Sequence, residues 1–472
     1  MESNVSVIMG GSIAGLLTAK VLSPYFSKII ILDRDQLFSN QQPRKGTAQA
    51  AHAHILLKRG LVGLDKLLPG FSQKVKSVGA VSTNATYDWQ SLFPEGYLCR
   101  FKSDMELLCQ SRHLLESTLR EFVIENTPNL EIVENASVTH VDLYADQRPE
   151  IQYTLNDENI HLHADLLVDC TGRNTKSPLH LKNAGFGDVP KKTISPYLGY
   201  ATRTYKNITL KDNYRSALIM AKDPNNTRGG IILPIEENQY IVTLFGFSKD
   251  YPPGNESAFL AFANSLRADT VFNAIKNAEP SSEIKQFVKK DSHFHQYSKL
   301  KKWPQGFLAI GDSITSFNPI YGQGITTTIT SAEILQKELL QYTSLEMFDL
   351  KSLQRKICQN YNLPWMIAKN EDLRWPGTEG EKANGLLKKM HGFSDMVARA
   401  STKDESVNYT YVSILHMMKL PTALLTPFML YKIIKHGRKE TVSDQTGQSS
   451  RSEPNNQANE SNPKNTDPLQ PD

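Results

Sequence analysis

Cysteine is scarce in this sequence, and the chain carries little excess charge of either sign. The four cysteines, Cys99, Cys109, Cys170 and Cys358, form no Cys-x-x-Cys pair and show no metal-ligand spacing. This pattern excludes a disulfide-rich fold and favours free thiols in a reducing compartment. The net charge of +4 comes from scattered basic residues, which argues against nucleic-acid binding.

Long apolar runs are also absent. No stretch approaches the roughly 20 apolar residues that a membrane-spanning helix needs. The first residues have neither the basic start nor the apolar core of a secretory signal, so we expect a cytoplasmic protein. The composition, 39% hydrophobic and 22% charged, is that of a globular chain, and 472 residues are enough for two lobes.

The most informative segment lies near the start of the chain. Apolar residues 5–8 lead into a glycine-rich turn, residues 10–15, and a helix-period stretch then reaches Leu22. A second apolar run, residues 29–32, ends on Asp33. Strand, glycine turn, helix, strand and acid in this order predict a Rossmann-like unit for an adenine dinucleotide. The candidate binding residues are Gly10, Gly11, Ser12, Ala14, Gly15, Asp33 and Arg34.

The glycine turn departs from Gly-x-Gly-x-x-Gly at one place. Gly10 and Gly15 occupy the first and third positions, but Ser12 stands at the second, where its small side chain can still fit near a phosphate and donate a hydrogen bond. Asp33 follows the last glycine at roughly the 20-residue distance of a ribose-binding acid. Ala14 excludes the Gly-x-Ser-x-Gly nucleophile elbow. This segment alone still allows an NAD dehydrogenase.

A second segment has the same character much later in the chain. Apolar residues 307–310 end on Gly311-Asp312, and small or ring-bearing residues 316–324 lead into a helix predicted over 325–340. Backbone free of bulky side chains beside a helix start predicts a second platform for an anion or a ring.

The remaining periodicity predicts an α/β chain. Helices are expected at 50–70 and 111–125, with a strand at 166–168. Between 190 and 300 the pattern becomes mainly β, with one helix near 256–267. The strands expected in this part cover residues 200–205, 216–220, 230–233 and 240–246.

Taken together, these segments resemble the class A FAD-dependent monooxygenases, which have the para-hydroxybenzoate hydroxylase fold. In that family, a strand ending in Gly-Asp places its carboxylate on the ribityl chain of the flavin, and Gly311 and Asp312 match it. A Pro-x-x-Gly-x-Gly segment then lies against the isoalloxazine ring. Its matching residues, with the first residue of the predicted helix, are Pro319, Gly322, Gly324 and Ile325.

Three more positions extend the resemblance. Arg44 and Gly46 match an Arg-x-Gly motif that reaches the cofactor, and Arg112 matches a flavin contact from the helix that it opens. Asp169, in Asp-x-Thr-Gly-Arg, would sit near both flavin and nicotinamide. The alternative interpretations are a solvated surface charge for Arg44 and a helix-surface ion pair for Arg112. Residues 44–56 and 317–324 are similar to a subgroup that includes bacterial polyether epoxidases.

The resemblance implies a function. NADH or NADPH would bind transiently and reduce FAD, and the reduced flavin would react with O₂ to give a C4a-hydroperoxide. Its distal oxygen would pass to a hydrophobic alkene or aromatic substrate, by epoxidation or hydroxylation. Because the cofactor carries this chemistry, we assign no catalytic residue and no metal ligand.

The same resemblance sets the expected domains. The fold would be α/β, with a Rossmann-like FAD-binding domain, a mainly β substrate domain and a helical C-terminal region. The expected boundaries are 1–189 for the first part of the FAD-binding domain, with interspersed substrate-domain strands, 190–300 for the mainly β substrate domain, 301–345 for the second FAD-binding part, 346–440 for the helical region and 441–472 for a disordered tail.

Two alternatives use the same fold. One is a flavin-dependent reductase of isoprenoid double bonds, and the other is a non-catalytic carrier of prenyl or lipid groups. Retention of Asp33, Asp312 and the glycine turn argues against the carrier. A flavin halogenase is disfavoured because none of the four tryptophans lies in a Trp-x-Trp-x-Ile-Pro motif.

Two further patterns allow more than one interpretation. His52 and His54 could both ligate a metal on one face of a strand, but no third ligand has a telling spacing, so we expect a structural or cofactor-proximal role. Residues 421–439 combine apolar and basic residues, which is compatible with peripheral membrane contact. A packed C-terminal helix with a basic end explains the same pattern and is the interpretation we prefer.

Overall fold

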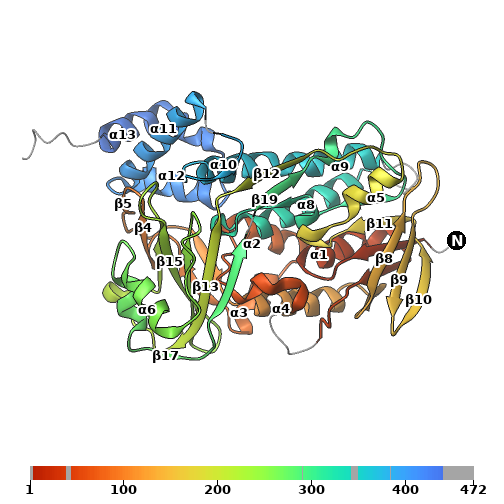
Figure 1. Ribbon diagram of the computed structural model, residues 1–472, viewed down its shortest axis with the longest axis horizontal. Coiled ribbons are helices and arrows are strands. Elements are labelled where there is room, and N and C mark those ends of the chain that lie inside the picture. Colours follow the sequence, from red (N-terminus) through yellow and green to blue (C-terminus); the bar gives the residue numbers. More distant parts are fainter. Residues whose placement is uncertain (1–3, 39–43, 290, 342–348, 383, 439–472) are drawn as a thin grey trace, which may run out of the picture. The chain divides into compact units, whose positions relative to one another are not determined.

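The computed structural model describes residues 4–38, 44–289, 291–341, 349–382 and 384–438. The predicted disordered tail, 441–472, lies outside these residues. The described chain has the predicted α/β fold: a parallel sheet, a large mainly antiparallel sheet and a helical end (Figure 1).

A five-stranded parallel sheet carries the start of the chain, with the strand order β20-β11-β1-β2-β7. Its inner strands are apolar and almost wholly buried, as is usual where helices cover a parallel sheet. Met9 pairs with both Leu32 and Asp169, and Asp169 pairs with Ala309, so four strands end at one edge. The strands are β1 (Val5–Met9), β2 (Lys28–Leu32), β7 (Leu130–Val133), β11 (Leu166–Asp169) and β20 (Phe307–Ala309).

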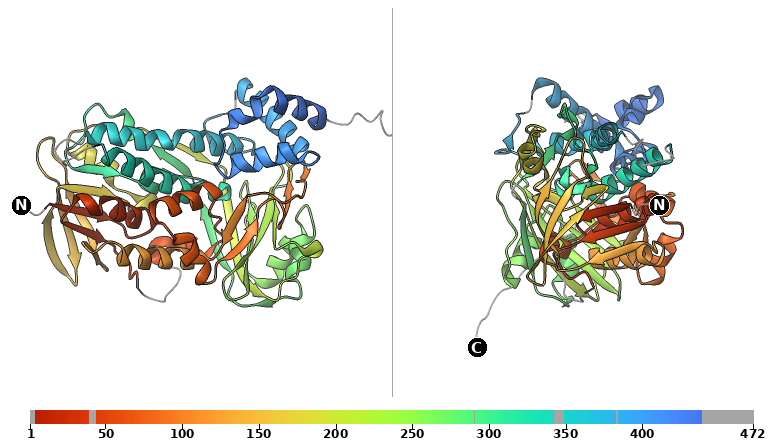
Figure 2. Two further views of the ribbon diagram at one scale, coloured as in Figure 1. Left: turned by 180° about the vertical axis from the view of Figure 1, so that it is seen from behind. Right: turned by 90° about the vertical axis from the view of Figure 1, so that its right-hand side faces the viewer.

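Three helices accompany this sheet. They are α1 (Ile13–Leu22), α4 (Arg112–Glu125) and α8 (Gln323–Leu339), and α1 packs against both of the others. The predicted helices at 111–125 and 325–340 are therefore present. The hydroxyl of Ser111 caps α4 by accepting a hydrogen bond from Leu114 N at 3.0 Å. Behind α8 lies α9 (Leu350–Asn360), and Figure 2 shows the two helices side by side.

The large sheet has the order β17-β13-β16-β15-β14-β4-β5, with β18 also paired to β13. It contains all four strands predicted between 190 and 300 and recruits β4 and β5 from the first part of the chain. The strands are β4 (Trp89–Phe93), β5 (Gly96–Tyr97), β13 (Leu198–Lys206), β14 (Ser216–Ile219), β15 (Arg228–Ile235), β16 (Gln239–Gly246), β17 (Glu279–Pro280) and β18 (Lys285–Lys289).

Three smaller sheets complete the β structure. One pairs β3 (Val81–Asn84) with β6 (Glu106–Cys109). A second contains β8 (Ser137–Asp142), β9 (Glu150–Leu155) and β10 (Glu158–His163). The third contains β12 (Lys191–Ser195), β19 (Ser292–His295), β21 (Thr315–Ser316) and β22 (Glu379–Gly380).

The helix predicted over 50–70 begins later than expected. It spans Lys58–Leu67 (α2), because the segment before it is held against the large sheet. His52 Nδ1 lies 2.7 Å from Thr202 Oγ1, and Ala53 N donates to Thr243 Oγ1 at 3.0 Å. These tertiary hydrogen bonds override the helical spacing of the apolar residues.

The C-terminal region is helical, as predicted. Its helix α11 packs against both α12 and α13 (Figure 1). In the part of the chain that the structure describes, no helix has the length and apolar character needed to span a bilayer. The other helices are α3 (Phe71–Ser77), α5 (Ser177–Asn183), α6 (Glu256–Asn264), α7 (Thr270–Ile275), α10 (Asn362–Asp372), α11 (Gly385–Ser401), α12 (Glu405–Leu415), the short η9 (Pro421–Leu425) and α13 (Pro427–Gly437).

Candidate functional site

A cavity of about 1520 Å³ opens along the edge where the parallel strands end. Gly10, Asp33, Cys170 and Asp312 line it, and each follows the carboxyl end of a strand of that sheet or lies just beyond it. The cavity therefore lies at the place where α/β sheets bind their ligands.

The glycine turn after β1 leaves no room for side chains. Gly10 has a φ of +102°, and a Cβ atom there would lie 2.5 Å from Cys170 O. At Gly15 a Cβ would lie 1.9 Å from Gly10 O. Glycine is thus required at both positions for α1 to start where it does, and the first turn of α1 faces the cavity through Ser12, Ile13 and Ala14.

Asp33 fixes this turn from β2. Its carboxylate accepts hydrogen bonds from Gly11 N at 2.6 Å and from Asp35 N at 2.8 Å. Burial raises the pKa of Asp33, and the two backbone donors and Arg44 oppose that rise. Asp33 lines the cavity together with Arg34, so the predicted ribose-binding acid also braces the turn.

A buried carboxylate, Glu116 on α4, gathers the basic residues of the site. It contacts Arg44, the Nη2 atom of Arg112 at 2.8 Å and the Nη2 atom of Arg120 at 3.2 Å. The hydroxyl of Ser12 donates to it at 2.8 Å. Burial alone would raise the pKa of Glu116, but Arg112 and Arg44 hold it below its usual value. The serine at the second glycine position therefore ties α1 to α4.

One guanidinium group of this cluster is turned toward the cavity. Three guanidinium groups surround Glu116, and Asp35 adds one carboxylate 3.5 Å from Arg44 Nη1. The Nη1 atom of Arg112 is buried without a hydrogen-bond partner among the described residues, and Arg112 lines the cavity. A guanidinium N–H left free beside a helix N-terminus fits the diphosphate of FAD.

Asp312 lies at the opposite side of the same edge, after β20. Gly311, with a φ of +80°, turns the chain there, and its N–H donates to Tyr361 Oη at 3.0 Å. The Asp312 carboxylate lines the cavity and forms no hydrogen bond within the described chain. Desolvation raises its pKa, while Lys289, Arg112 and Arg173 oppose the rise. An acceptor left free in the cavity fits the predicted contact with a ribityl hydroxyl.

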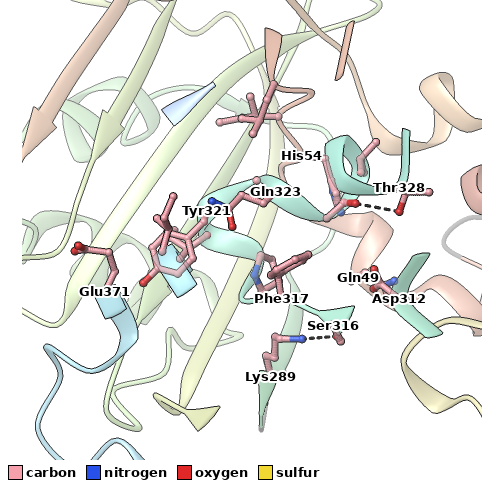
Figure 3. Close-up of a pocket in the computed structure, with 18 of the residues that line it drawn as sticks. Gln49, His54, Lys289, Asp312, Ser316, Phe317, Tyr321, Gln323, Thr328 and Glu371 are labelled. Carbon is pink, nitrogen blue, oxygen red and sulfur yellow. Dashed lines mark hydrogen bonds between the residues drawn. The ribbon is translucent and has the colours of Figure 1, made fainter. Parts of the chain in front are cut away.

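Lys289 is a cavity residue that the sequence patterns did not indicate. Its side chain is buried at the end of β18, and Nζ donates to Ser316 Oγ at 2.8 Å (Figure 3). Burial lowers the pKa of Lys289 to about 8. The residue adds a cation close to Asp312, and only its position in the fold reveals this.

The loop before α8 forms another wall of the cavity. Pro319, Gly322, Gly324 and Ile325 line it as predicted, together with Tyr321. Gly322 has a φ of +66°, which glycine adopts at low cost. Gly322 and Gly324 leave the loop without a side chain at two positions, which suits close contact with a flat ring, while Phe317, Tyr321 and Gln323 add side chains to the same wall (Figure 3).

The predicted ligand Asp169 does not line the cavity. Its carboxylate is fully buried and accepts hydrogen bonds from Thr171 N at 2.8 Å, Thr171 Oγ1 at 2.6 Å and Ser177 Oγ at 2.5 Å, as well as from Thr175 Oγ1. Both oxygens are therefore occupied in holding the loop after β11. The Asp-x-Thr-Gly-Arg motif reaches the cavity through Thr171, Gly172 and Arg173 instead.

Both histidines of the 44–56 segment line the cavity. His52 Nδ1 lies 2.7 Å from Thr202 Oγ1, and His54 Nδ1 lies 2.8 Å from the carbonyl oxygen of His52. Burial lowers the pKa of each to about 4, so both are neutral at physiological pH. Within the described residues there is no cluster suited to a metal ion. Both histidines thus lie in the wall of the cavity that also contains the candidate cofactor residues.

Beyond the loop before α8 the cavity continues into a chamber that is lined by large apolar side chains and by charged residues such as Glu371, Arg374 and Asp395. One wall is the large sheet, through side chains such as Trp89, Tyr200 and Phe245. The helical end and η9 supply another wall, which includes Met390 and Leu424. The large sheet and the C-terminal helices thus line the same cavity as the candidate cofactor residues.

The predicted site residues fall into two groups. Those that line the cavity are Gly10, Ser12, Ala14, Asp33, Arg34, Arg44, Gly46, Arg112, Asp312, Pro319, Gly322, Gly324 and Ile325. Those that shape the backbone or the loops behind it are Gly11, Gly15, Asp169 and Gly311.

Comparisons with known proteins agree with this geometry. The FAD binding domain family matches residues 2–344. Protein Rv3254 of Mycobacterium tuberculosis is 26% identical over 377 residues, which cover 77% of this chain and 78% of that protein.

Two solved structures have a similar fold. A flavoprotein/dehydrogenase from Cytophaga hutchinsonii has a TM-score of 0.64 at 14% identity, over 92% of this chain and 99% of that one. The p-nitrophenol 4-monooxygenase PnpA of Pseudomonas putida has a TM-score of 0.60 at 15% identity, over 87% and 97%. The family match covers most of the chain. The chain belongs to the FAD binding domain family and is an FAD-dependent oxidoreductase.

Proposed function

We propose that this chain is a monooxygenase that transfers one oxygen atom from O₂ to a hydrophobic alkene or aromatic substrate, with FAD as cofactor and NADH or NADPH as transient reductant. The observation that carries the proposal is the continuity of the cavity. Its lining runs from Asp33 and Arg44 past Asp312 into a chamber whose walls include large apolar side chains such as Trp89, Phe245 and Met390. A substrate in that chamber would lie next to the flavin-binding residues.

The chain's own residues bind and position. Arg44, Arg112 and the N-terminus of α1 supply positive charge for the diphosphate, and Asp312 supplies an acceptor for the ribityl chain. The bound FAD would supply the redox chemistry that activates O₂. The apolar walls of the chamber would exclude water from the reacting groups.

The polar groups of the chamber can orient a substrate. His52 is neutral and shares a hydrogen-bond chain with Thr202 and Thr243, whose hydroxyl oxygens lie 2.6 Å apart. A few fixed polar groups in an apolar pocket are the usual basis of orientation in small-molecule sites.

The likeness to known proteins supports this class of reaction without fixing the substrate. PnpA acts as a p-nitrophenol 4-monooxygenase, and PqsL of Pseudomonas aeruginosa, with a TM-score of 0.57 and 16% identity over 79% of this chain and 95% of that one, is described as a probable FAD-dependent monooxygenase. The similarity of residues 44–56 and 317–324 to polyether epoxidases favours epoxidation as the finer version of the proposal.

The test is oxidation of NADH and NADPH by the purified holoenzyme with a panel of polyenes, quinols and phenols. We expect one compound to accelerate oxidation and to gain one oxygen atom from labelled O₂. Reduction of a double bond without O₂ would identify an isoprenoid reductase instead. A colourless protein that rejects FAD would contradict both and point to a carrier.

A further inference from the structure

Large apolar side chains are exposed together along η9 and α13. Leu420, Leu425, Phe428 and Tyr431 are 56–62% exposed, and Ile434 is 44% exposed. We call these five residues the η9–α13 surface. Several large exposed apolar side chains within one short segment are a common feature of interaction sites.

The packing needs of α13 do not explain this surface. Phe428, Tyr431 and Ile434 lie three residues apart, so they share one face of the helix. The helix packs through its other side, where Ile433 is fully buried and Gly437 lies so close to α11 that a Cβ would be 2.4 Å from Met396 O. The packed helix predicted from the sequence is therefore present, and a second apolar face remains uncovered within the described chain.

Basic side chains accompany the exposed rings. Lys432 Nζ lies 4.8 Å from the centre of the Phe428 ring, and Lys435 Nζ lies 6.0 Å from that of Tyr431. Lys432 also pairs with Asp404 at 3.0 Å, whereas Lys435 is exposed. Lys419, which precedes Leu420 in the chain, is also exposed, and its Nζ lies 4.8 Å from the centre of the Tyr409 ring on α12. Apolar residues mixed with lysines complement an anionic lipid headgroup region rather than a purely apolar protein face.

The same segment forms part of the cavity wall. Pro421, Thr422, Leu424 and Leu425 of η9 line the cavity, and Leu425 is also part of the η9–α13 surface. The short segment η9 thus contributes residues both to the wall of the chamber and to the exposed surface. A layer that covers the surface would lie beside this wall of the chamber.

We propose that the η9–α13 surface docks on an anionic lipid bilayer and that the apolar substrate enters the chamber past η9 from that bilayer. The second half of this statement rests on the proposed function, and the first half does not. Exposed aromatic and aliphatic side chains enter the headgroup layer, while Lys419 and Lys435 contact the anionic headgroups.

Vesicle co-sedimentation of the full-length holoenzyme tests the docking. We expect binding to vesicles of equal parts phosphatidylcholine and phosphatidylglycerol, and weaker binding at high salt or with phosphatidylcholine alone. The double variant Phe428→Ser/Tyr431→Ser removes two rings from the interface, so its affinity falls about tenfold or more. The matched control Leu179→Ser/Leu340→Ser, at residues 55% and 73% exposed elsewhere, keeps wild-type affinity.

Three outcomes would overturn the docking proposal. The first is a wild-type protein that does not sediment with anionic vesicles, and the second is a double variant that binds as well as wild type. The third is self-association of the wild type without lipid that Phe428→Ser/Tyr431→Ser abolishes, which would assign the surface to a second copy of the chain. Since sedimentation needs no substrate or reductant, these outcomes leave the monooxygenase assay independent, and failure of that assay leaves the docking result unchanged.

Discussion

Asn318 donates its side-chain amide to Asp372 at 2.7 Å and thereby joins the cavity loop to α10. Tyr321 donates its hydroxyl to the same carboxylate oxygen at 2.8 Å, and the other oxygen, Oδ2, is buried with no hydrogen-bond partner in the described part of the chain. Burial raises the pKa of Asp372 to about 7, although both donors oppose the rise. The carboxyl group that anchors this cavity loop therefore titrates near neutral pH.

Replacing Asp372 with Asn should change how stability depends on pH. The folded carboxyl binds its proton more tightly than the unfolded one, so its contribution is complete below a pH of about 4 and is lost as the pH rises through about 7. We expect wild type to lose about 4 kcal/mol relative to Asp372→Asn between these limits. Urea unfolding across this range measures it. A difference that stays constant across this pH range would exclude the raised pKa.

Removing the charge of Glu116 should destabilise the fold. Glu116→Gln leaves the guanidinium groups of Arg44, Arg112 and Arg120 facing one another without their shared carboxylate. We expect a loss of about 3–5 kcal/mol, seen as a lower melting temperature in calorimetry. Glu121→Gln, at an exposed position of the same helix, is the control. Equal melting temperatures for the two variants would contradict the central role of Glu116.

Gly15→Ala should abolish flavin binding. The added Cβ would lie 1.9 Å from Gly10 O, so the turn and the start of α1 must move apart. We expect purified protein with little bound flavin, measured as absorbance per chain. In Gly392→Ala the new Cβ meets no atom within 4 Å, so that variant should keep its flavin and gain up to about 1 kcal/mol of helix stability. Full flavin occupancy of Gly15→Ala would disprove the steric argument.

Asp312→Ala tests the flavin end of the site. The carboxylate makes no hydrogen bond within the described protein, so its removal should leave the fold intact while the bound flavin is largely lost. Circular dichroism reports the fold, and visible absorbance reports the flavin. Asp188→Ala, whose side chain is 77% exposed, provides a charge-matched control. A fully yellow Asp312→Ala protein would remove the role assigned to this residue.

The elements of the parallel sheet could be predicted because their signals are local. The apolar runs of β1, β2, β11 and β20 each stand beside a glycine or an acid, and parallel strands end at one edge. That rule places Asp33 and Asp312 at one cavity although they are distant in sequence. The start of α2 could not be predicted, since hydrogen bonds from His52 and Ala53 to the large sheet decide it.

The roles of side chains that interact with residues far away in the sequence could not be predicted. In the sequence, Glu116 is indistinguishable from any other polar residue of an amphipathic helix. Its ion pair with Arg44, from a distant segment, is visible only in the structure. The four-residue spacing of Arg112, Glu116 and Arg120 was a usable signal for part of this cluster. Lys289 had no such signal. The motif that contains Asp169 is visible in the sequence. In the structure, however, its carboxylate accepts hydrogen bonds from Thr171, Thr175 and Ser177 in the loop that follows.

The strand order of the parallel sheet also sets the order in which the site can form during synthesis. β1 leaves the ribosome before its sheet partner β11, at residues 166–169, and well before β20, at residues 307–309. Such distant pairings make folding slow, because long loops must close before the contacts form. The parallel sheet and the cavity at its edge are therefore incomplete until β20 and α8 have been synthesised, so we expect FAD to be retained only after these segments have emerged.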